Sequence, residues 1–145
     1  MRFMMMIKAD RGTEAGVPAD EKEFAAMGKY NAELIKAGVL LDAAGLQPSS
    51  TGARVRFSEG KPTVVDGPFS ETKELIAGFW MIQVKSKEEA IEWAKRVPFS
   101  PGLHFRGEGE IELRQLYEAS DFGPALEAHD SLTRAALREA RTHGV

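Results

Sequence analysis

The 145-residue sequence contains no cysteine and only three histidines, His104, His129 and His143. Without cysteine the chain has no disulfide bond, no thiolate metal site and no cysteine nucleophile. The histidines match no metal-ligand spacing, so we expect no metal site, and no motif predicts a cofactor. The net charge is only −3, from 19 basic and 22 acidic residues. Nucleic-acid binding needs clustered positive charge, so we expect no nucleic-acid partner.

Long apolar runs are also missing. The apolar run at residues 3–7 is interrupted by Lys8, Asp10 and Arg11. A secretory signal needs about 7–15 apolar residues and a membrane-spanning helix about 20. We therefore expect a cytoplasmic protein without a membrane segment. The length is that of one domain.

Hydrophobic periodicity and turn residues predict the secondary structure. The predicted strands are 3–7, 39–46, 53–57, 63–65, 78–84 and 110–117, and the predicted helices are 18–37, 86–97 and 124–141. A loop is expected at residues 10–17. Phe24, Met27, Leu34 and Ile35 form an apolar stripe on the first helix, with Asn31 as its polar exception. Ser86 and Glu89 form a capping box at the second helix.

This order of elements predicts an α+β, ferredoxin-like fold with an inserted β-hairpin and a C-terminal helix. Residues 1–117 form the predicted domain, and residues 118–145 form a helical extension. Residues 3–7 and 79–82 are apolar at odd and even positions, so both faces of the sheet are predicted to be apolar. We expect a second copy of the chain to cover the outer face in a barrel-like homodimer. The tail helix is the alternative cover.

The strongest local signal is the segment Asp66-Gly67-Pro68-Phe69, followed by Glu71-Thr72-Lys73-Glu74. Asp, Gly and Pro are good turn residues, so a turn alone accounts for the pattern. In the functional interpretation, the strand end presents the carboxylate of Asp66 in a cleft. Partial burial would then suit Asp66 to act as a general acid or base.

These residues resemble the DGPF-domain branch of the YCII-related family. The resemblance extends to Gly45-Leu46-Gln47-Pro48, Gly78-Phe79-Trp80, residues 90–94 with Pro98, and residues 111–114. It covers about residues 2–117 and implies a ferredoxin-like barrel of the dimeric α/β-barrel type. It also implies a small enzyme or ligand binder with a His–Asp pair in a cleft, the Asp mapping to Asp66. The family's histidine lies in the first helix, which contains no histidine here, and Glu23, Tyr30 and Glu33 are the polar candidates in its place.

We therefore expect a homodimer that binds a small molecule in a cleft. If the protein is an enzyme, we expect Asp66 to carry its acid/base chemistry. The expected substrate-binding residues are Gly67, Pro68, Phe69, Glu71, Lys73, Tyr30 and His104. Two alternatives stay open. One is a non-catalytic ligand sensor, and the other is a regulatory partner in sigma-factor signalling, which the resemblance implies.

Overall fold

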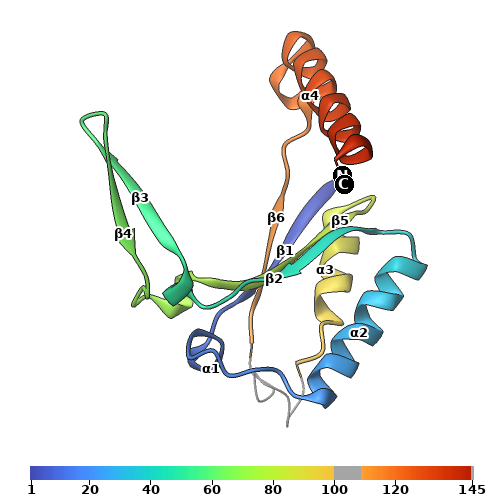
Figure 1. Ribbon diagram of the computed structural model, residues 1–145. Helices are drawn as coiled ribbons and strands as arrows, with labels where there is room; N and C mark the ends of the chain where they lie inside the picture. The colour runs from blue at the N-terminus through green and yellow to red at the C-terminus, as the bar shows by residue number, and fades with distance from the viewer. Residues whose placement is uncertain (100–108, 145) are drawn as a thin grey trace.

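The computed structural model describes residues 1–99 and 109–144. Within these residues the fold is α+β, with one antiparallel four-stranded sheet in the order β2-β5-β1-β6 (Figure 1). Its strands are β1 (Arg2–Lys8), β2 (Leu40–Gly45), β5 (Ile76–Gln83) and β6 (Ile111–Gln115). The helices α2 (Glu21–Lys36) and α3 (Lys87–Lys95) lie together on one face of the sheet. The α+β prediction is confirmed.

Side-chain caps set where the two long helices begin. The Asp20 carboxylate accepts a hydrogen bond from the Glu23 backbone at 2.8 Å, and Ser86 Oγ accepts one from the Glu89 backbone at 3.1 Å. Each cap satisfies a backbone N–H that has no partner inside its helix. The predicted helix start at residue 18 is therefore wrong, because Asp20 takes the capping position. Gly38, with φ +73°, turns the chain after α2.

The core lies between the sheet and the two helices. Alternate residues of β1 and β5 face the helices, and Leu34 of α2 packs among them without exposed surface. The fully or nearly buried core side chains are Phe3, Met5, Ile7, Tyr30, Leu34, Val39, Trp80, Ile82, Val84, Ala90 and Val97. Asn31, the polar exception in the helix stripe, accepts a hydrogen bond from Trp80 Nε1 at 2.7 Å. Two members of the predicted stripe are not in the core, because Phe24 and Ile35 are 68% and 64% exposed.

The other face of the sheet carries half-buried apolar side chains. The strand register places Met4 opposite Met81 and Met6 opposite Phe79 on this face. The tail helix α4 (Pro124–His143) packs against the 3₁₀ turn η3 (Ala119–Phe122) and stands beyond the end of the sheet (Figure 1). It therefore does not provide the cover that the sequence left as an alternative. We call this surface the open face.

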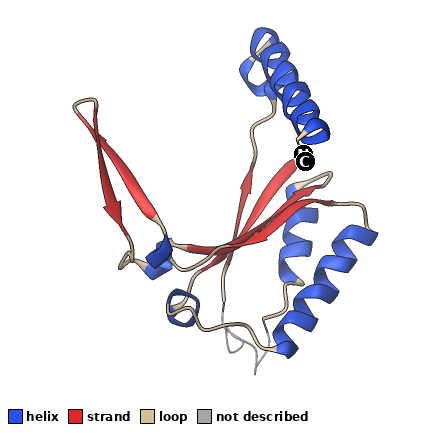
Figure 2. Ribbon diagram, in the orientation of Figure 1, coloured by secondary structure: helices blue, strands red, loops and turns tan. Residues whose placement is uncertain are grey.

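The inserted hairpin consists of β3 (Ala53–Ser58) and β4 (Lys61–Asp66), as predicted. These strands pair with each other in a sheet of their own, which projects away from the main sheet (Figure 2). Glu59 and Gly60 turn the chain with positive φ values of 49° and 78°. Val55, Phe57 and Val64 on one face of the hairpin are exposed.

Three shorter elements complete the described structure: the helix α1 (Arg11–Glu14) and the 3₁₀ turns η1 (Ser49–Thr51) and η2 (Thr72–Glu74). The segment 10–17 was expected to be a loop. Asp10 and Thr13 instead form a capping box, in which the Asp10 carboxylate accepts from the Thr13 backbone at 2.7 Å. No helix in the described residues is long and apolar enough to cross a bilayer.

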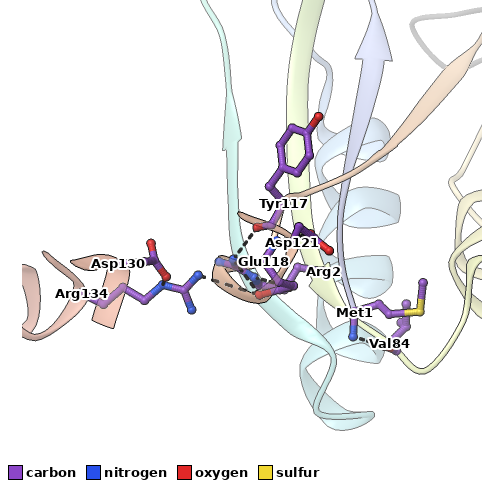
Figure 3. Close-up of polar contacts among 8 residues, drawn as sticks. All are labelled: Met1, Arg2, Val84, Tyr117, Glu118, Asp121, Asp130 and Arg134. Carbon is purple, nitrogen blue, oxygen red and sulfur yellow. Dashed lines mark hydrogen bonds and ion pairs between the residues drawn. The ribbon is translucent and has the colours of Figure 1, made fainter. Parts of the chain in front are cut away.

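Ion pairs attach the tail to β1 (Figure 3). The Arg2 guanidinium donates to both carboxylate oxygens of Glu118, at 3.0 and 3.1 Å, and this contact lowers the pKa of Glu118. Arg134 reaches Glu118 at 3.9 Å and Asp130 at 2.7 Å. The second contact is the i,i+4 pair expected from the spacing of these residues on a helix.

Candidate functional site

An apolar pocket of about 360 Å³ lies beside the first turns of α2, at the end of β2. The described residues that line it are Ile7, Thr13, Gly16, Val17, Ala19, Glu23, Phe24, Met27, Gly45, Leu46, Pro48, Ala77 and Pro98. Among these side chains only Thr13 and Glu23 are polar. The hydroxyl of Thr13 is occupied by Asp10, since it accepts from the Asp10 backbone at 2.9 Å. The volume and the apolar lining are those of a site for a small organic molecule.

The pocket explains the unexpected exposure of Phe24. Phe24, near the start of α2, borders the pocket instead of packing in the core. Met27, one turn further along α2, packs partly on the core and also lines the pocket. These two positions therefore present apolar surface to the pocket. The family resemblance implies a histidine in this helix, whereas the helix here contributes the apolar side chains of Phe24 and Met27 to the pocket.

Ser49 joins three segments next to the pocket. Its backbone N–H and its hydroxyl both donate to the carboxylate of Glu14 in α1, at 3.0 and 2.5 Å. Its hydroxyl also accepts a hydrogen bond from the Phe69 backbone at 3.0 Å. The preceding residue, Pro48, lines the pocket. Ser49 thus connects the pocket wall to the segment that follows β4. We call residues 66–74 the DGPF loop.

The DGPF loop folds back on the base of the hairpin. The Arg54 guanidinium lies 3.8 Å from the centre of the Phe69 ring and 3.7 Å from the carboxylate of Glu71. The Gly67 backbone donates to the Gly52 carbonyl at 3.0 Å. Gly67 also lies so close to Ser49 that a Cβ atom at residue 67 would overlap the carbonyl oxygen of Ser49. This close approach requires glycine.

The structure brings several of the predicted site residues together. Gly67, Pro68, Phe69, Glu71 and Lys73 all lie in the DGPF loop, and Lys73 is in its η2 turn with an exposed side chain. Asp66 ends β4 opposite Ala53 and is exposed, and its carboxylate makes no hydrogen bond or ion pair with a described residue. The partial burial expected for an acid/base group is therefore not present in the single chain. His104 lies outside the described residues.

Tyr30 is not part of this group. Its side chain is 3% exposed, and its ring packs edge-on against Trp80 with centroids 5.3 Å apart. The hydroxyl donates to the Trp93 carbonyl at 2.7 Å, and burial raises the pKa of Tyr30 to about 12. The expectation that Tyr30 binds substrate beside Asp66 is corrected by this position. Its helical spacing with Leu34 places it in the core between α2 and α3.

Neither the pocket nor the Ser49 contacts were predicted from the sequence. Gly45-Leu46-Gln47-Pro48 carried part of the family resemblance, and Leu46 and Pro48 form one wall of the pocket. Nothing in the local pattern indicates that Glu14 meets Ser49, because the two residues are 35 positions apart. Among the described residues, no three His, Asp or Glu side chains come together so that they could hold a metal ion.

The fold and the pocket define a small α+β protein with an antiparallel sheet and an apolar site beside its first long helix. The chain belongs to the YCII-related family, since the model of the YCII-related domain matches residues 1–118. An uncharacterized protein of Rhizobium meliloti (strain 1021) is 37% identical over 76 residues, which are 52% of this chain. The chain spans 61% of the length of that relative.

One solved structure also resembles the chain. It is a 5-chloro-2-hydroxyhydroquinone dehydrochlorinase from Burkholderia phenoliruptrix AC1100 in complex with 2,5-dihydroxybenzoquinone. The TM-score is 0.43 and the sequence identity is 12%, over 83% of this chain and 98% of that one.

Proposed function

We propose that this protein is a homodimer that binds a small, mostly apolar molecule in the pocket beside α2. The observation that carries the proposal is the apolar lining of that 360 Å³ pocket. Small-molecule sites are concave, mostly apolar and few in number on one protein. Phe24 supports the same conclusion, because a large aromatic side chain that is 68% exposed at a pocket rim is available to contact a ligand.

The open face supports the homodimer. Four cross-strand neighbours form a row on this face, one from each strand, in the order Arg114, Met4, Met81 and Asp42. Turning a second copy by 180° about an axis parallel to the strands brings Arg114 of one copy over Asp42 of the other. Met4 then lies over Met81. The same patch therefore matches itself in charge and in apolar character, as a two-fold interface requires.

Acid/base chemistry at Asp66 is the second candidate function, favoured by the fixed geometry of the DGPF loop. Arg54, Ser49 and Gly52 hold this loop on its inner side, while the Asp66 carboxylate points to a surface that one chain leaves exposed. In this proposal the second copy supplies the shielding that a general acid or base needs. Lys73 would then contact a substrate together with the rest of the loop.

The binding proposal is tested with indole as a small apolar probe, followed by NMR of methionine methyl groups labelled with ¹³C. We expect the Met27 methyl signal to shift and saturate, while the signals of Met4 and Met81 on the open face stay in place. Phe24→Ala should weaken indole binding. Ile35→Ala is the matched control, because Ile35 lies on the same helix, is similarly exposed and does not line the pocket. Equal weakening by both variants, or a silent Met27 methyl, would contradict the proposal.

A further inference from the structure

Ser49 lies where the pocket wall, α1 and the DGPF loop meet. We propose that Ser49 is a positioning residue that couples the pocket to the DGPF loop, so that a molecule bound in the pocket changes the setting of the loop. The inference rests on the proposed function, since it requires that the pocket binds a small molecule. It gives that same pocket a regulatory role, because binding there would change the conformation of the DGPF loop.

The first part of the coupling is on the pocket side. Pro48 lines the pocket directly and is bonded to Ser49. Thr13 and Gly16 line the pocket on either side of Glu14, which accepts two hydrogen bonds from Ser49. Charge-assisted hydrogen bonds of this kind are short and geometrically specific. A ligand that presses on either wall therefore moves Ser49 with that wall.

The second part is on the loop side. The Ser49 hydroxyl has one proton, which it donates to Glu14, so its oxygen is left to accept the hydrogen bond from the Phe69 backbone. The carbonyl of Ser49 packs against Gly67 at a distance that excludes any side chain there. Two independent contacts thus transmit a displacement of Ser49 to residues 67 and 69.

The consequence reaches Asp66. Gly67 is bonded to Asp66 and is also held by the Gly52 carbonyl at the base of the hairpin. A shift of Gly67 therefore changes the direction of the exposed carboxylate on the same loop. Close-packed contacts with no free space transmit such shifts instead of absorbing them. Binding in the pocket would thus change how the Asp66 carboxylate meets a substrate or a partner protein.

The experiment is an indole titration of the full chain, with the Met27 methyl followed for binding and the Gly67 and Phe69 amides for the loop. In the unchanged protein we expect all three signals to shift with the same saturation curve. Ser49→Ala should keep the Met27 shift and lose the indole-dependent shift of the Phe69 amide, because it removes the hydroxyl that accepts from Phe69. The Gly67 shift should persist in part, because the Ser49 carbonyl stays in place. Ser50→Ala is the matched control, because Ser50 is the exposed neighbour on the same turn. Ser49→Thr keeps a hydroxyl and should restore the response.

The possible results separate the two proposals. A Phe69 shift that persists undiminished in Ser49→Ala, beside the Met27 shift, overturns the role of the Ser49 hydroxyl. A Met27 shift without any loop shift in the unchanged protein overturns the coupling and leaves the binding proposal standing. If Met27 itself is silent, the binding proposal fails. Should Ser49→Ala not fold, Glu14→Ala takes its place: it removes the acceptor of both Ser49 hydrogen bonds, and an undiminished loop response there would also overturn the coupling.

Discussion

Reversing the charge of Asp42 tests how two copies of the chain meet. In the proposed dimer, Asp42→Lys places a positive charge against Arg114 of the second copy, and the two-fold axis makes this happen twice. An exposed ion pair contributes about 0.2–1 kcal/mol, and a like-charged pair costs a similar amount. Losing two attractions and gaining two repulsions therefore costs roughly 1–4 kcal/mol. The dimer dissociation constant should rise roughly 5- to 1000-fold.

The assay is sedimentation velocity over a range of protein concentrations. The double variant Asp42→Lys with Arg114→Asp restores opposite charges at both places, so it should dimerise nearly as well as the unchanged protein. Glu88→Lys is the control, because Glu88 is an exposed acidic residue on α3, on the far side of the sheet. The effect of Asp42→Lys should weaken at high salt. If Asp42→Lys and Glu88→Lys dimerise equally, or if the double variant is no better than the single one, the proposed packing is refuted.

Two further predictions concern the site and the core. Gly67→Ala should destabilise the protein by about 1–3 kcal/mol in urea unfolding, because its methyl group would overlap the Ser49 carbonyl. In the control Gly28→Ala no atom lies within 4 Å of the new methyl group, and the substitution should stabilise α2 by about 0.5–1 kcal/mol. If Gly67→Ala left the stability unchanged, the close contact with Ser49 would be contradicted. Tyr30→Phe should cost about 0.5–1.5 kcal/mol at neutral pH, because the hydrogen bond from the buried hydroxyl to the Trp93 carbonyl is lost while the Arg96 backbone still donates to that carbonyl. Burial raises the pKa of Tyr30 from 10.0 to about 12, so the tyrosine's contribution is complete below pH 10 and is lost as the pH rises to about 12. The stability difference between the two proteins should therefore shrink over that range, and a constant difference would show that Tyr30 is not held neutral by the fold.

The main elements of the fold could be predicted because their signals are local. The cap at Ser86, the positive φ at Gly38 and the hairpin turn at Glu59-Gly60 each depend on a few neighbouring residues. The start of α2 was misplaced because Pro18 and Asp20 are both good first-turn residues, and only the structure shows which one caps the helix. The helix α1 was missed because four residues are too few for a periodic pattern.

The candidate site could be predicted only in part, because most of its contacts join distant segments. The sequence identified the DGPF loop through turn residues and family resemblance. It did not indicate that Arg54 would stack on Phe69 or that Glu14 would bind Ser49, since neither pair is local. Tyr30 was misassigned because a tyrosine in an amphipathic helix has the same pattern in a core as at a binding surface. Burial decided between the two.

The hairpin's separate sheet also has a consequence for how the protein unfolds. Strands β3 and β4 bond to each other and not to the four-stranded sheet, so the hairpin can open while that sheet stays intact. Its amide protons should exchange with solvent through a local event of lower free energy than global unfolding. For the same reason, residues can be added or removed at its tip without shifting the register of the main strands. The hairpin is the part of the chain in which length is free to change.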